Sequence, residues 1–115
     1  MTDDSVEKYR QDLAIIRDTA AQVMKDFEIF GIDIKFSGDP FCAWGELKSQ
    51  VAPVLFELFQ KDQSRFQSLL YRIDINEKNF RKLLADTSTD FSNNLAELTL
   101  QREFQKILTR RFFNS

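Results

Sequence analysis

The clearest pattern in the chain is an apolar seam near the N-terminus, whose members are separated alternately by three and four residues. The seam consists of Val6, Tyr9, Leu13, Ile16, Ala20, Val23, Phe27 and Phe30. Because residues three and four apart share one face of an α-helix, this seam predicts a long helix over about residues 3–30. Gly31 follows the last member, where a left-handed residue commonly ends a helix.

The segment 31–39 has a different pattern, because its apolar residues alternate with charged ones. A period of two predicts extended backbone. A strand needs a partner, and residues 71–75 also alternate, so one interpretation is a small hairpin-like pairing of 32–36 with 71–75. The other interpretation is an irregular loop that packs across one end of a helical bundle.

The middle of the chain predicts three shorter helices. Asp39 and Pro40 resemble the start of the first of them. Pro53 interrupts its apolar spacing and predicts a kink or a restart, because proline has no N–H to donate. The segment 54–59 is apolar in nearly every direction. We therefore expect Phe56 to be buried, and Phe56→Ala to cost about 3–5 kcal/mol.

Two further helix starts follow from polar residues. Ser64 and Gln67 form a capping-box pattern, and Asn76 has the position of a cap before the next apolar group. The last helix is predicted over about residues 89–112. Its two halves carry apolar residues on opposite sides, so we expect them to bury different faces.

These elements together predict an all-α fold. The expected architecture is a compact bundle of four or five helices with long first and last helices, in a single domain of residues 1–115. The main irregular segment is expected at 31–39.

The composition narrows the chemistry that such a bundle could perform. The 115 residues include no histidine and one cysteine. The lack of histidine excludes Ser-His-Asp and Cys-His catalysis and histidine-ligated zinc, and a single thiol excludes all-cysteine metal sites. We therefore predict no catalytic residue, no cofactor and no metal site. A carboxylate- and metal-dependent enzyme remains the second alternative, because acidic residues on different helices could still come together in the fold.

Compartment and membrane association follow from the same composition. No stretch approaches the roughly 18 apolar residues of a membrane span, and the N-terminus lacks the basic and apolar regions of a signal peptide. The lone Cys42 cannot form an intrachain disulfide, which favours a reducing setting. We expect a cytoplasmic chain with no membrane span.

Apolar positions outside the core-facing seams suggest self-association. Ile15 and Ile29 lie nearly opposite the first seam, and further apolar residues lie on the second face and at the end of the last helix. The interface candidates are Ile15, Ile29, Leu100, Phe104, Ile107, Phe112 and Phe113. They predict a homo-oligomer, with a dimer favoured, or another protein as partner.

A basic patch is expected near the C-terminus, formed by Arg102, Lys106, Arg110 and Arg111. The whole chain has a net charge of −2, which disfavours nucleic acid as a partner. Cations are also favoured near a helix C-terminus by its dipole. Residues 1–60 are net acidic and residues 61–115 net basic, so the asymmetry could equally serve antiparallel pairing of subunits.

The one thiol lies in an aromatic group, and Phe41, Cys42 and Trp44 are candidates for a ligand pocket. A thiol near a helix start can have a lowered pKa. The leading functional hypothesis is a non-enzymatic interaction or scaffold protein that self-associates through its first and last helices. The alternative is a regulatory module that binds a small ligand or anion near these residues, with Arg72 or Arg110.

Overall fold

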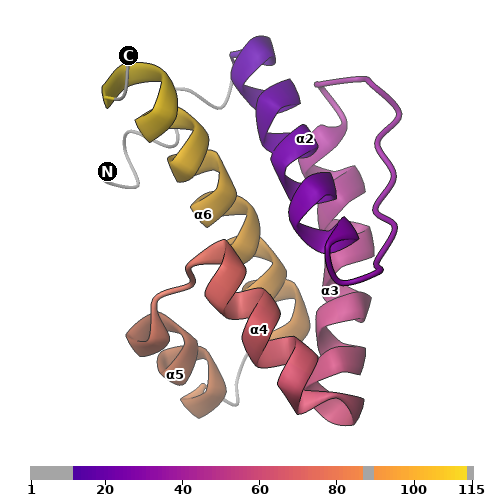
Figure 1. Ribbon diagram of the computed structural model, residues 1–115, viewed down its shortest axis with the longest axis vertical. Helices are drawn as coiled ribbons and strands as arrows, with labels where there is room; N and C mark the ends of the chain where they lie inside the picture. The colour runs from indigo at the N-terminus through magenta and orange to yellow at the C-terminus, as the bar shows by residue number, and fades with distance from the viewer. Residues whose placement is uncertain (1–11, 87–89, 114–115) are drawn as a thin grey trace.

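The computed structural model describes residues 12–86 and 90–113, which form five helices and no strand (Figure 1). The helices are α2 (Leu13–Glu28), α3 (Ala43–Lys61), α4 (Gln63–Ile73), α5 (Glu77–Ala85) and α6 (Phe91–Phe113). The predicted all-α class is confirmed, and the first and last of these helices are among the longer ones. The part of the N-terminal seam before residue 12 lies outside the described residues. Within the described residues, no helix combines the length and apolar character needed to cross a membrane.

Helix α6 is the centre of the bundle. It packs against α2 and α3 most extensively and meets α4 and α5 over shorter stretches. Figure 1 shows α2 and α6 running side by side, with α5 at the lower left of the view, away from α2. Helix α5 contributes no fully buried residue and is therefore a cover on the bundle rather than part of its centre.

The buried face of α6 winds around the helix. It consists of Leu95, Ala96, Thr99, Leu100, Glu103, Phe104, Ile107 and Leu108. Residues four apart advance by about 40° around a helix, so the two ends of this face point in different directions. The first half joins the large core formed with α2, α3 and α4. The second half packs on Ile15 of α2 in a smaller cluster. The prediction that the two halves bury different faces is confirmed.

Helix ends follow local sequence in most places. Gly31 has a φ of 75°, and it closes α2 in the left-handed conformation expected from its position. The side chain of Asn76 caps α5 as predicted, by accepting hydrogen bonds from the backbone of the first turn. The capping box at Ser64 was a wrong prediction. Asp62 caps α4 instead, with its carboxylate accepting from the Arg65 N–H at 3.1 Å.

The segment after α2 is an irregular loop, so the pairing of 32–36 with 71–75 does not form. Residues 71–73 belong to α4. The loop lies along α3, where the Gln50 side-chain amide accepts from the Lys35 N–H at 2.8 Å and donates to the Lys35 carbonyl at 2.7 Å. The Ser37 hydroxyl donates to Glu46 at 2.8 Å. Side chains of α3 therefore satisfy the backbone that a partner strand would otherwise satisfy.

Helix α3 continues through Pro53 without a restart. Its buried face consists of Ala43, Leu47, Val51, Ala52, Leu55 and Leu58. Phe56 is 43% exposed, so the expectation that it is deeply buried was wrong. The reason is geometric: a helix on the outside of a bundle buries one stripe, and Phe56 follows the buried Leu55 by about 100°.

Candidate functional site

The most unusual feature of the interior is a cluster of charged side chains between α2, α4 and α6. The Asp26 side chain is 1% exposed, and its Oδ1 accepts from Gln22 Nε2 at 2.9 Å and from Arg72 Nε at 3.1 Å. Its Oδ2 lies 3.4 Å from the Lys106 ammonium. The Lys106 ammonium also contacts the carboxyl group of Glu103, whose side chain is completely buried. This buried charge cluster therefore contains two acids and two bases.

The two acids of the cluster differ in protonation. Burial, followed by the hydrogen bond to Asp26, raises the pKa of Glu103 to about 8. Glu103 is therefore protonated near neutral pH, next to the ionised Asp26. Burial acts to raise the pKa of Asp26 as well. The hydrogen bond from Glu103 and the charge of Lys106, with the bonds from Arg72 and Gln22, outweigh burial and lower that pKa.

The chemistry open to this cluster is limited by its enclosure. A perturbed acid pair can serve catalysis when a substrate reaches it, but solvent reaches neither carboxyl group here. Among residues 12–86 and 90–113, no three acidic or thiol side chains gather where they could hold a metal ion. The cluster thus joins three helices, and its geometry supports a structural role.

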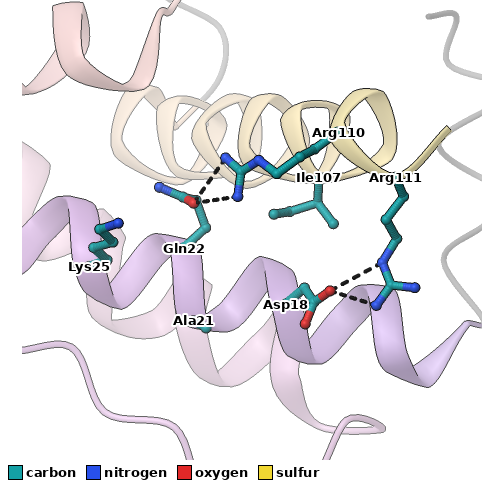
Figure 2. Close-up of a pocket in the computed structure, with 7 residues that line it drawn as sticks. All are labelled: Asp18, Ala21, Gln22, Lys25, Ile107, Arg110 and Arg111. Carbon is teal, nitrogen blue, oxygen red and sulfur yellow. Dashed lines mark hydrogen bonds and ion pairs between the residues drawn. The ribbon is translucent and has the colours of Figure 1, made fainter. Parts of the chain in front are cut away.

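A groove on the surface lies next to the cluster, between α2 and α6 (Figure 2). It has a volume of about 230 Å³. Its lining is Asp18, Ala21, Gln22 and Lys25 from α2 with Ile107, Arg110 and Arg111 from α6. Gln22 connects groove and cluster, because its amide nitrogen donates to Asp26 while its oxygen accepts from both terminal nitrogens of Arg110 at 3.2 Å.

The predicted basic patch is distributed over several intrachain contacts. Arg102 donates to the Asp74 carboxylate at 2.7 Å at the end of α4. Arg111 contacts the Asp18 carboxylate with two nitrogens, the closer at 2.6 Å. Lys106 belongs to the buried charge cluster, and Arg110 bonds to the neutral Gln22. Acidic residues of α2 and basic residues of α6 thus pair within one chain, which uses part of the charge asymmetry between its halves.

The predicted interface candidates separate into two groups. Ile15, Leu100, Phe104 and Ile107 are buried inside this chain. Their apolar area is already covered by intrachain packing and is not presented to a partner. Ile29, Phe112 and Phe113 are exposed. They lie at the C-terminal ends of α2 and α6, outside the grooves described here.

The three candidates for a ligand pocket do not form a common cavity in the described residues. Phe41 is 81% exposed, while Trp44 packs edge-on against Phe104 with ring centres 5.9 Å apart. The Trp44 indole donates to Glu97 at 2.8 Å. The Cys42 thiol is exposed and donates to Asp39 at 3.4 Å. That hydrogen bond, together with the Asp39 charge, raises the pKa of the thiol, which is the opposite of the lowering that a position near a helix start can cause.

A wide apolar opening lies between α4 and α5, and we call it the α4–α5 groove. It has a volume of about 500 Å³, and its lining is Phe59, Gln63, Phe66, Gln67, Leu70, Tyr71, Ile75, Glu77, Phe80 and Leu84. Beneath it four helices each contribute one ring to a closed aromatic circuit. Its contacts are Phe59–Phe66, Phe66–Phe80, Phe80–Phe91 and Phe91–Phe59, with ring centres 5.2–6.1 Å apart. Three of these rings, Phe59, Phe66 and Phe80, also line the groove.

Sequence reasoning missed both the buried acids and this groove. Glu103 precedes the buried Phe104 and follows the buried Thr99 by four, so it lies on the core face of its helix. Asp26 follows the buried Val23 by three in the same way. An acid inside an apolar stripe was the available signal. The α4–α5 groove had no such signal, because it depends on the angle at which α5 covers the bundle.

Comparison with known proteins adds no relative. No family model matches the chain, no curated protein matches it, and no solved structure matches it.

Proposed function

We propose that this protein is a non-enzymatic interaction module that binds a helix of a partner protein in the α4–α5 groove. The observation that carries the proposal is a wide apolar opening with exposed aromatic and aliphatic rims. Tyr71 is 88% exposed and Leu84 is 44% exposed. Exposed apolar side chains that gather around a groove are typical of protein-binding surfaces. Single exposed apolar side chains, by contrast, are normal on any protein surface.

The dimensions of the groove suit a short amphipathic helix. Helix α4 has 11 residues and α5 has 9, so at 1.5 Å per residue the walls are about 13–16 Å long. A partner helix of two to three turns would place anchors at positions i, i+3, i+4 and i+7 between them. The area is that of a transient interface, below about 1,200 Å² in total.

The groove lining carries one charged residue, Glu77, so the preference for an acidic partner rests on the basic residues elsewhere on α4 and α5. Residues 63–85 carry five basic and two acidic side chains. Among the described residues, Lys78 and Lys82 of α5 have no ion pair, while Arg81 pairs with Glu77. An excess of positive charge would attract a helix with an acidic polar face and would oppose pairing with a second copy of the same surface. The proposal therefore places the partner on α4 and α5 rather than on α2 and α6.

The test uses the full chain and a labelled synthetic peptide of about 14 residues, with leucine and phenylalanine on one helical face and glutamate on the other. Fluorescence anisotropy would measure its affinity. The variants Tyr71→Ser and Leu84→Ser remove exposed side chains of the rim. Phe41→Ser is the matched control, because Phe41 is 81% exposed and does not line the groove.

The proposal expects each rim variant to weaken the peptide by about tenfold, since truncating an interface anchor costs more than about 1 kcal/mol. The Phe41 control should bind like the wild type. A version of the peptide with lysine in place of glutamate should bind more weakly. No binding up to about 1 mM peptide, equal binding by the rim variants, or tighter binding of the lysine peptide would each contradict the proposal.

A further inference from the structure

The groove between α2 and α6 carries positive charge that its own residues do not neutralise. Arg111 and Asp18 pair with each other across it. Lys25 has no ion pair with any described residue. Arg110 bonds only to the amide oxygen of Gln22, which is a neutral acceptor. Two positive charges, Lys25 on α2 and Arg110 on α6, therefore line the same groove, and neither pairs with a carboxylate of a described residue (Figure 2).

Helix dipoles account for only part of this arrangement. Lys25 and Arg110 each lie in the last turn of their helix, where a cation is favoured by about 0.3–1 kcal/mol. That effect does not supply an acceptor for the guanidinium. Arg110 is held with its terminal nitrogens on Gln22, and Gln22 is itself held by its bond to the buried Asp26. The guanidinium is thus positioned at the groove before any ligand arrives.

The remaining properties of the groove select the ligand. Its volume of about 230 Å³ is below the 300–1,000 Å³ of sites for drug-sized molecules, so the ligand is small. The lining also includes the apolar side chains of Ala21 and Ile107, and Figure 2 shows Ile107 between Arg110 and Arg111. Two uncompensated cations match a dianion, and a phosphoryl group carries about −1.5 to −2 charges near pH 7. Guanidinium groups also bind phosphate oxygens with paired, charge-assisted hydrogen bonds.

We propose that the α2–α6 groove binds the phosphoryl group of a small molecule, which Lys25 and Arg110 hold beside Ala21 and Ile107. This site is separate from the α4–α5 groove and does not rest on the function proposed for that groove. Its ligand would exchange the neutral acceptor of Arg110 for a charged one and would bridge α2 and α6.

The test is a titration of the ¹⁵N-labelled full chain, followed by backbone amide shifts at constant pH and ionic strength. Sodium phosphate is the main probe, and acetate is the monoanion of similar size. Phenyl phosphate distinguishes a phosphate ester, whose organic part would contact Ala21 and Ile107, from free phosphate. Tighter binding of phenyl phosphate would support an ester as the ligand, and tighter binding of inorganic phosphate would support the free ion.

Phosphate should produce saturating shifts near Gln22 and Arg110. Lys25→Gln and Arg110→Gln should each weaken binding by about tenfold, the loss of one charge-assisted contact. Lys61→Gln and Arg81→Gln are the matched controls, since these exposed cations pair with Glu57 and Glu77 outside the groove. The Lys25 side chain has no ion pair with a described residue, so we expect Lys25→Gln to fold. That variant still tests the site if Arg110→Gln unfolds.

Three results would overturn this site. They are linear shifts without saturation, acetate binding as tightly as phosphate, and Lys25→Gln binding phosphate like the wild type.

Discussion

The Lys106 ammonium of α6 lies 3.4 Å from the buried Asp26 carboxylate of α2 and also contacts the buried carboxyl group of Glu103. The two acids are 77 positions apart in the sequence, on the two helices that run side by side in Figure 1. Burial and the neighbouring Asp26 raise the pKa of Glu103 to about 8, so Glu103 is protonated near neutral pH. Lys106 and Arg72 supply the positive charge that keeps Asp26 ionised.

The raised pKa of Glu103 predicts how the unfolding free energy depends on pH. The pKa of Glu103 is raised to about 8 in the folded chain from its ordinary 4.5. Between these values the folded chain holds a proton that the unfolded chain has released, so the unfolding free energy falls as the pH rises. Glu103→Gln has no proton to lose, and its amide can still donate to Asp26. We expect the variant to gain stability relative to the wild type as the pH rises from about 5 to about 9.

Urea unfolding at several pH values would measure that difference. Glu57→Gln is the control, because Glu57 is exposed and pairs only with Lys61. It should keep the slope of the wild type. A Glu103→Gln variant with the same slope as the wild type would show that Glu103 is ionised when buried. At the acid end the lowered pKa of Asp26 acts separately, and the stability it provides is lost only as the pH falls below about 4.

The core predicts a contrast between two phenylalanines. Phe27 is fully buried in the large core, whereas Phe56 is 43% exposed. Phe27→Ala should lower the unfolding free energy by about 3–5 kcal/mol, because it leaves a cavity in packed surroundings. Phe56→Ala should cost about 1 kcal/mol, since half its ring is already in water. Thermal or urea unfolding would measure both, and a greater cost at Phe56 would show that this surface of α3 is covered in solution.

The thiol of Cys42 should react slowly for an exposed cysteine. The thiolate is the reactive form, and the hydrogen bond to Asp39, with its negative charge, raises the pKa of the thiol. Asp39→Asn removes the charge and should accelerate the reaction with iodoacetamide near neutral pH. Mass spectrometry over time would follow the reaction. An unchanged rate in the variant would mean that Asp39 does not control this thiol.

The sequence predicted the helices better than it predicted their contacts. The polar break at 86–90 located α6 within two residues at its start, and Asn76 marked the start of α5, because these signals are local. The alternation in 31–39 belongs to a loop, whose backbone is bound by an α3 side chain, Gln50, which no local pattern could identify. Phe56 was misjudged because an apolar wheel does not show which stripe faces the bundle.

The candidate sites required the fold. Asp26 and Lys106 are 80 positions apart, and Asp18 and Arg111 are 93 apart. Only the alignment of α2 against α6 brings these pairs together, and that alignment is set by apolar packing elsewhere. The same alignment buried Ile15 and Phe104, which had been predicted at an interface between subunits. The position of a partner therefore has to be inferred from the apolar surface that intrachain packing leaves exposed.

The most direct test of the account asks where the acidic amphipathic peptide contacts the chain. Amide and methyl shifts of the ¹⁵N- and ¹³C-labelled protein would be followed during its titration. The account predicts that the largest shifts lie on Leu70, Tyr71, Ile75 and Leu84, around the α4–α5 groove. Shifts concentrated instead on Ile29, Phe112 and Phe113, at the ends of α2 and α6, would contradict it.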